Sequence, residues 1–288
     1  MKSSNAKVKI VTDSSAYLEP EVIERYDIRV VPLKVAFGAE LYTEGVDITN
    51  EKFYQKLSRG NVIPTTSQPS VGDFIRVYRE LVQRGHPILS IHVASKLSGT
   101  VDSALAAKNA FPQAQIGIVD SLSIAMGMLV ALAAEAAERG QTLPQIKASI
   151  EKLNASINSL GIFETLGYLW KGGRIGKARA LVGILLRIKP ILTFRDGDVK
   201  VLAKPRTMAR ATEYILKFIE KQTKGSTSLH GWLAHTHVFE AALDLERELR
   251  SRFNWVELRF FELGPVLGTH VGPGFIGLGF YTDEDRQL

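Results

Sequence analysis

The chain has 288 residues, 45% of them hydrophobic, and its net charge is +6 at pH 7. This length allows one large or two ordinary domains with a sizeable core. The sequence contains no cysteine, which excludes disulfides, cysteine nucleophiles and thiolate metal sites. Lysines and arginines are interleaved with acidic residues, so we expect no nucleic-acid partner.

The N-terminal sequence "MKSSNAKVKIV" has no apolar segment before the first expected strand, so we expect no signal peptide. The longest nearly uncharged stretch spans 121–137, and it is interrupted by Glu135. It is too short and too rich in alanine for a membrane span. We therefore expect a soluble, cytoplasmic protein without stable membrane insertion.

Strands and helices alternate over the first half of the chain. Apolar runs of strand length, followed by small polar residues, lie at 8–15, 28–37, 87–94 and 115–121. Helical patterns lie at 19–27, 50–59, 74–84, 101–111 and 124–139. Ser70 and Asp73 have the spacing of a capping box before the third helix, and 65–70 is expected to be a loop. This order predicts an α/β unit with a mostly parallel sheet and helices on both faces.

The second half of the chain does not continue this regular alternation of strands and helices. A glycine-rich basic loop is expected at 171–179, a short helix at 180–188, and a hairpin around Asp196-Gly197. Two further helix patterns span 208–222 and 239–253, and two strand patterns span 229–238 and 255–263. The pattern predicts an α+β unit with a mixed sheet.

The segment "SKLSGT" (95–100) stands where a strand leads into a helix. Unpaired N–H groups at a helix N-terminus favour an anion, Gly99 allows close approach, and Ser98 and Thr100 offer hydroxyl donors. The alternative is that Ser98 or Thr100 simply caps the helix, which is a common role for these residues. Similar polar segments end at Ser15 and at Ser121. Because parallel strands end at one edge of a sheet, these loops and 65–70 are expected to line one cleft.

The segment "GPVLGTHVGPG" (264–274) is expected to be a loop in which glycines bring Thr269 and His270 close to a ligand. A lone histidine in a loop is more often structural or solvated. His235 and His237 share one strand face, but no third ligand has the spacing of a zinc site, so no metal is expected. Arg174 lies in the basic loop, which suits either an anion or ordinary solvation.

Seven short motifs occur in order: "TDSS", "TTSQPS", "SKLSGT", "VDS", "KGGRI", "ILLRIKPIL" and "GTHVGPG". Together they resemble the DegV family of fatty-acid-binding proteins, the acyl-carrying partner (FakB type) of bacterial fatty acid kinase. The resemblance runs from about Lys7 to about Phe280. It implies two domains, over 7–160 and 161–288, with a long-chain fatty acid in the cleft between them and no cofactor.

The resemblance also implies which residues bind the ligand. Hydroxyls of Thr66 and Ser98, the backbone near Gly99, and His270 with its neighbour Thr269 would hold the carboxylate. Arg174 would contact the head group or a fatty acid kinase catalytic protein. Such a protein is a carrier in phospholipid metabolism and has no catalytic residues of its own. Apolar residues in 88–94, 124–134 and 180–188 are candidates to line the tail pocket.

Two other functions stay open from the residues. Ser98, His270 and Asp120 have the chain order of a hydrolase triad, although no G-x-S-x-G elbow surrounds Ser98. A lipid-sensing regulatory protein is the other alternative, although no basic recognition helix stands out.

Overall fold

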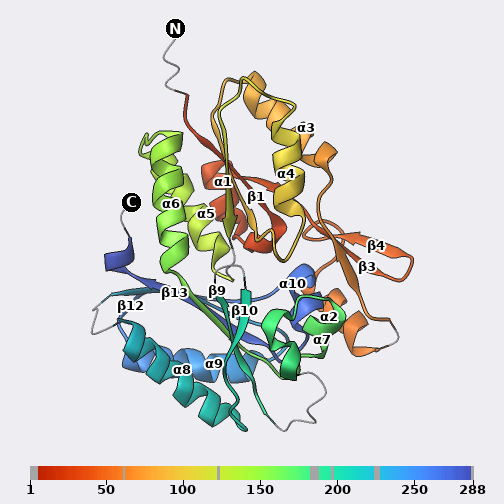
Figure 1. Cartoon of the computed structure of the whole chain (residues 1–288), viewed down its shortest axis with the longest axis vertical. Helices are drawn as coiled ribbons and strands as arrows, with labels where there is room; N and C mark the ends of the chain where they lie inside the picture. The colour runs from red at the N-terminus through yellow and green to blue at the C-terminus, as the bar shows by residue number, and fades with distance from the viewer. Residues whose placement is uncertain are drawn as a thin grey trace.

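A computed structural model describes residues 6–60, 62–121, 124–181, 188–195, 198–223 and 228–286. Its elements form a four-stranded sheet, a six-stranded sheet and a small three-stranded sheet (Figure 1). The four-stranded sheet and its helices lie above the six-stranded sheet in the view of Figure 1, and the small sheet lies to one side. The expected α/β class is confirmed.

The four-stranded sheet has the order β2-β1-β6-β7, and all of its pairings are parallel, as predicted. Its strands are β1 (Lys9–Asp13), β2 (Arg29–Val31), β6 (Ile88–Val93) and β7 (Ile116–Ser121). The expected single strand over 28–37 is wrong. It divides at Pro32 into β2 and β3 (Lys34–Phe37), which belong to different sheets. Proline cannot donate a ladder hydrogen bond, and it separates the two strands.

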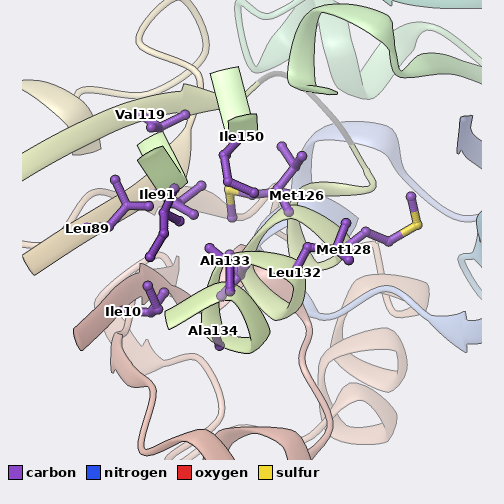
Figure 2. Packing of buried hydrophobic residues seen from close by; sticks show 14 of the residues in the cluster. Ile10, Leu89, Ile91, Val119, Met126, Met128, Leu132, Ala133, Ala134 and Ile150 are labelled. Carbon is purple, nitrogen blue, oxygen red and sulfur yellow. The ribbon is translucent and has the colours of Figure 1, made fainter. Parts of the chain in front are cut away.

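Helices cover both faces of this sheet, also as predicted. One face packs on α1 (Pro20–Tyr26), α5 (Met126–Glu138) and α6 (Leu143–Ser156), the other on α3 (Val71–Gln83) and α4 (Thr100–Lys108). Side chains alternate along β1, so that Ile10 faces α5 whereas Val11 faces α3. Figure 2 shows α5 presenting Met126 and Leu132 within this core. The capping box of Ser70 and Asp73 is present, and α6 is a helix without a counterpart among the predicted elements.

The small sheet is antiparallel, with the order β4-β3-β5, and packs on α2 (Asn50–Ser58). Its outer strands are β4 (Glu40–Thr43) and β5 (Thr65–Ser67). The loop expected at 65–70 is therefore wrong over its first three residues. Thr66 pairs with Val35 of β3, and β-branched threonines suit a strand even without an apolar run.

The six-stranded sheet has the order β10-β9-β8-β13-β11-β12 and is mixed, as predicted, since only β11 and β12 pair in parallel. Its strands are β8 (Asn158–Ile162), β9 (Ile191–Arg195), β10 (Asp198–Ala203), β11 (Leu229–His235), β12 (Trp255–Glu262) and β13 (Ile276–Thr282). The hairpin of β9 and β10 is confirmed. Its turn at Asp196-Gly197, and most of the helix expected at 180–188, lie outside the described residues. The division into two domains near residue 160 stays a prediction, and residue 160 itself lies within β8.

One face of this sheet is covered by α8 (Met208–Thr223) and α9 (Phe239–Arg252). The opposite face meets the first half of the chain, where Trp232 of β11 joins the core around α5. The loop expected at 264–274 is wrong over most of its length, because Pro265–Val271 forms the short helix α10. Pro265 at its first position has the fixed φ that a helix start requires. Within the described ranges, no helix is long and apolar enough to cross a bilayer.

Replacing Gly127 by alanine should destabilise the protein. A Cβ at this position of α5 would lie closer than 3.0 Å to the Trp232 ring and to the carbonyl of Ala16. Overpacking of this kind costs about 1–3 kcal/mol of unfolding free energy. Urea unfolding measures the loss.

Gly72→Ala is the matched control in α3. There a Cβ would meet only Ser70 Oγ, at an ordinary 3.6 Å. This variant should keep its stability or gain up to about 1 kcal/mol. Equal stability of the two variants would contradict the close packing of α5 on the six-stranded sheet.

Candidate ligand-binding site

A cavity lies between the carboxyl ends of β1 and β6 and the six-stranded sheet. The space between its walls, part of which is open to solvent, is about 950 Å³. Most of the lining is apolar and comes from both halves of the chain, including Val93, Met126, Phe194 and Phe275. The polar lining residues are Ser15, Thr66, Gln68, Ser98, Arg174 and His270. The cavity therefore combines an apolar interior with a small set of hydroxyl, amide, guanidinium and imidazole groups.

Thr66 and His270 come together although 204 residues separate them. Thr66 Oγ1 lies 2.8 Å from His270 Nε2. β5 supplies the threonine and α10 supplies the histidine. The contact closes the cavity between the small antiparallel sheet and the C-terminal part of the chain.

The His270 imidazole is neutral at pH 7. Burial, with the positive charge of Arg174 as the second cause, lowers its pKa from 6.5 to about 4. His270 Nδ1 is buried without a hydrogen-bond partner. Because a bare buried N–H is rarely tolerated, the proton belongs on Nε2, where it is donated to Thr66 Oγ1. The Thr66 hydroxyl then keeps its own hydrogen for a ligand acceptor.

Ser98 and Gly99 lie directly before α4. Ser98 Oγ is 2.8 Å from Thr100 Oγ1, and Gly99 is the N-cap residue. No side chain caps α4, which lies wholly within the described residues, so the capping alternative for Ser98 and Thr100 is not realised. Ser98 lines the cavity, whereas its partner Thr100 is fully buried and does not.

Arg174 ties two of these segments together. Its Nε donates to the carbonyl of Leu97 at 3.0 Å, and its Nη1 donates to the carbonyl of Gly172 at 2.6 Å. Gly172 follows α7 (Gly167–Lys171) and packs against the His270 ring. Arg174 thus holds 97–98 beside α7 and places a positive charge at the polar end of the cavity.

Thr269 has a different environment from the other predicted ligand residues. Its side chain is buried, its hydroxyl donates to the carbonyl of Pro265 at 2.8 Å within α10, and it does not line the cavity. Of the segments proposed for the tail pocket, 88–94 contributes Val93, and 124–134 contributes Ile124 and Met126. Most other residues of these two segments belong to the core.

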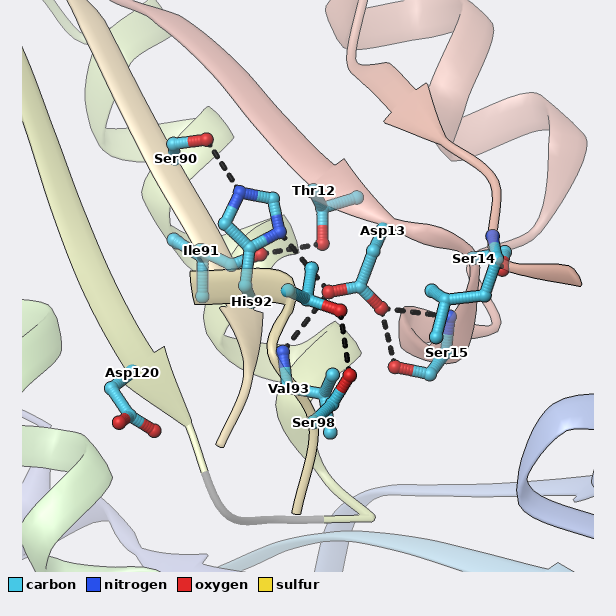
Figure 3. Close-up of polar contacts among 12 residues, drawn as sticks. Thr12, Asp13, Ser14, Ser15, Ser90, Ile91, His92, Val93, Ser98 and Asp120 are labelled. Atoms are coloured by element: carbon cyan, nitrogen blue, oxygen red, sulfur yellow. Dashed lines mark hydrogen bonds and ion pairs between the residues drawn. The ribbon is translucent and has the colours of Figure 1, made fainter. Parts of the chain in front are cut away.

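A chain of hydrogen-bonded polar side chains, fully buried, lies beside the cavity, and the sequence does not predict it (Figure 3). His92 Nδ1 is 3.1 Å from Asp13 Oδ2, and His92 Nε2 is 2.6 Å from Ser90 Oγ. The Tyr78 hydroxyl extends the chain, at 2.7 Å from Ser90 Oγ. His92 stands in an apolar run, so nothing in its local pattern distinguishes it from a core position.

The Asp13 carboxylate anchors two loops that reach the cavity. It accepts hydrogen bonds from the backbone N–H of Val93 at 3.0 Å, and from the N–H and hydroxyl of Ser15. Ser15 and Val93 both line the cavity. Asp13 therefore fixes the ends of β1 and β6 from within, without contacting the cavity itself.

The geometry does not favour the hydrolase alternative. Ser98 pairs with Thr100, His270 pairs with Thr66, and Asp120 accepts from the N–H and hydroxyl of Ser95. None of these contacts joins the three members of the expected triad. Figure 3 shows Asp120 apart from the Asp13–His92 chain.

His235 and His237 do not form a metal site. The His235 ring packs on Phe239 and Phe260, whereas the His237 ring stacks on Tyr54. Throughout the described ranges, no group of three or more His, Asp or Glu residues is arranged to hold a metal ion.

Comparisons with known proteins identify the family. The family model described as "Uncharacterised protein, DegV family" matches residues 7–283. The chain belongs to the DegV family. A DegV domain-containing protein of Halalkalibacterium halodurans is 37% identical over 281 residues, which cover 96% of this chain and 99% of the relative.

Solved structures of similar proteins have the same fold. A DegV family protein from Thermus thermophilus, described in terms of fatty acid binding, superposes with a TM-score of 0.91 at 37% identity, covering 96% of this chain and 99% of the other. A stearic acid-binding protein from Eubacterium ventriosum gives a TM-score of 0.88 at 28% identity, covering 98% and 100%. Fatty acid binding is thus described for proteins with this architecture, a DegV family member among them.

A buried carboxyl group supports the helix that contains His270. Glu44 follows β4 and accepts hydrogen bonds from Ser14 Oγ at 2.6 Å, from the Tyr17 hydroxyl at 3.1 Å and from the N–H of Val266 at 2.8 Å. Burial raises its pKa from 4.5 to about 7, against the lowering effect of these hydrogen bonds. Glu44 therefore joins the turn after β1, which contains Ser14 and Tyr17, to the start of α10.

The stability of the wild type relative to Glu44→Gln should fall as pH rises. A raised carboxyl pKa means that the folded chain holds the proton more tightly than the unfolded chain. The contribution of this group is full below pH 4.5, is lost as pH rises to about 7, and is constant above. The difference should amount to on the order of 3 kcal/mol across that window.

Urea unfolding of both proteins at several pH values measures this difference. The difference between the two proteins isolates Glu44, because all other titrating groups are shared. A difference that does not change between pH 4.5 and 7 would contradict the assigned environment of Glu44.

Proposed function

We propose that this protein binds one long-chain fatty acid in the cavity between its two halves and presents the carboxylate to a fatty acid kinase. The observation that supports this best is the composition of the cavity. Its lining is mostly apolar, and its few polar members include Thr66, Ser98 and the neutral His270. An amphipathic ligand with one polar end suits this combination.

The polar end suits a carboxylate in particular. Thr66, Ser98 and the backbone at Gly99 offer neutral donors, and Arg174 adds positive charge while its guanidinium donates to two backbone carbonyls. Neutral donors avoid the desolvation cost of a fully buried ion pair. The donors thus compensate the charge of the head group at a partly exposed position.

The tail supplies most of the gross binding energy. Burying a methylene contributes roughly 0.8 kcal/mol, so about sixteen give on the order of 13 kcal/mol before ordering costs. Each hydrogen bond to a charged oxygen adds about 1.5–3 kcal/mol. The tail therefore determines affinity, whereas the hydroxyl groups determine where the carboxylate lies. A fixed carboxylate is what a kinase needs to transfer a phosphoryl group to one of its oxygens.

Thr66→Ala and Ser98→Ala should each weaken oleate binding by about tenfold or more, because each removes one hydrogen bond to a charged oxygen. Thr66→Ala also leaves the His270 Nε2–H unpaired and Ser98→Ala leaves the buried Thr100 hydroxyl unpaired, so urea unfolding should show a loss of about 1–3 kcal/mol in each folded variant. Titration of fluorescent fatty acid displacement measures the affinity. Thr269→Ser is the matched control: it keeps the hydroxyl bonded to Pro265 and should bind oleate like the wild type. Wild-type affinity in both alanine variants would show that the carboxylate lies elsewhere.

Kinase presentation has its own test. A bacterial fatty acid kinase catalytic protein, supplied with ATP and the loaded carrier, should form acyl phosphate and release ADP. Omitting the carrier should abolish the reaction, and Ser98→Ala should slow it. A carrier that binds oleate yet supports no phosphorylation with any such kinase would favour the lipid-sensing alternative.

A further inference from the structure

Gln68 lines the cavity two residues beyond Thr66, at the end of the small antiparallel sheet. Its side chain is exposed, and its amide makes no hydrogen bond within the described part of the chain. We propose that Gln68 is a further ligand of the bound carboxylate and covers the solvent side of the head-group site. This inference rests on the fatty-acid function proposed above.

The contact with Gly99 is the first argument. A Cβ at Gly99 would lie 2.6 Å from Gln68 Oε1 and 2.7 Å from Gln68 Cδ, closer than real Cβ atoms approach. Gly99 has a φ of −75°, which any residue adopts, so its backbone does not require glycine. A Cβ here would instead enter the space that the Gln68 amide occupies, and this exposed end of the side chain would have to shift. Gly99 thus lets the amide lie directly beside Ser98.

The chemistry of the amide is the second argument. A carboxylate has about four acceptor positions, and the hydroxyls of Thr66 and Ser98 fill two of them with one donor each. The His270 Nε2 proton is already donated to Thr66. The Gln68 amide has two N–H donors and no charge, so it can fill a further position from the exposed side.

Gln68→Ala should weaken oleate binding by about tenfold, because one charge-assisted hydrogen bond is lost. Binding of oleyl alcohol, which has the same tail and no charge, should change much less. Gln68→Glu tests whether a negative charge at this position opposes binding of the carboxylate. It should bind oleate more weakly than Gln68→Ala, since two carboxylates would then meet, and should bind oleyl alcohol like Gln68→Ala.

The Gly99→Ala variant tests the contact independently. Its Cβ should displace Gln68 and weaken oleate binding by a similar factor. The Gln68→Ala/Gly99→Ala double variant should lose no more than either single variant, because both changes remove the same interaction. Independent, multiplying losses would contradict the proposal.

Two outcomes separate this inference from the proposed function. Oleate binding by Gln68→Ala at the wild-type level, or equal losses for oleate and oleyl alcohol, would overturn the role of Gln68 alone. If the wild type itself binds neither oleate nor oleyl alcohol, the proposed fatty-acid function is contradicted, and with it the role of Gln68. Urea unfolding of each variant confirms that the compared proteins are folded.

Discussion

The hydrogen bond between Thr66 and His270 is the constraint on which the candidate site depends. It joins β5 of the small sheet to α10 near the end of the chain. His270 Nε2 donates this bond, and burial, with Arg174 as the second cause, lowers the imidazole pKa to about 4, so that the ring is neutral at pH 7. The site is therefore assembled by tertiary packing and does not exist in either half of the chain alone.

Two buried carboxyl groups fix the positions of the segments around the site. Asp13 gathers the loops after β1 and β6, and Glu44 joins the turn after β1 to α10. Both lie outside the predicted set of ligand residues, and both act on residues that line the cavity. Burying such groups is costly unless their oxygens are hydrogen-bonded, and each carboxyl accepts three or more such bonds. Their arrangement stabilises one geometry of the cavity walls.

Local patterns predict much of the fold. Apolar runs and helical periods locate β6, β7, α3 and α9, and their alternation predicts the parallel sheet. The misassigned segments are those in which pairing partners or packing override local preference. Thr65–Ser67 forms a strand only because β3 lies beside it, and Pro265–Val271 forms a helix despite its glycines. The split at Pro32 is the exception, since proline itself signals a break.

The candidate site is also predictable only in part, because its residues come together through contacts between distant segments. Thr66, Ser98 and His270 were reached through a family resemblance, whereas their mutual distances depend on contacts across 204 residues. The Asp13–His92 chain gave no local signal, because His92 stands in a strand of apolar residues. Gln68 lies within a quoted motif, but its role depends on the empty space at Gly99, which no sequence spacing reveals.

The most direct test of the central claim is mass spectrometry of organic extracts from the purified protein, beside a mock-purified control. The account predicts about one long-chain fatty acid per chain, and the chains recovered would show which tails fit the apolar interior. A protein that carries no fatty acid and fails to take up added palmitate or oleate would contradict the account.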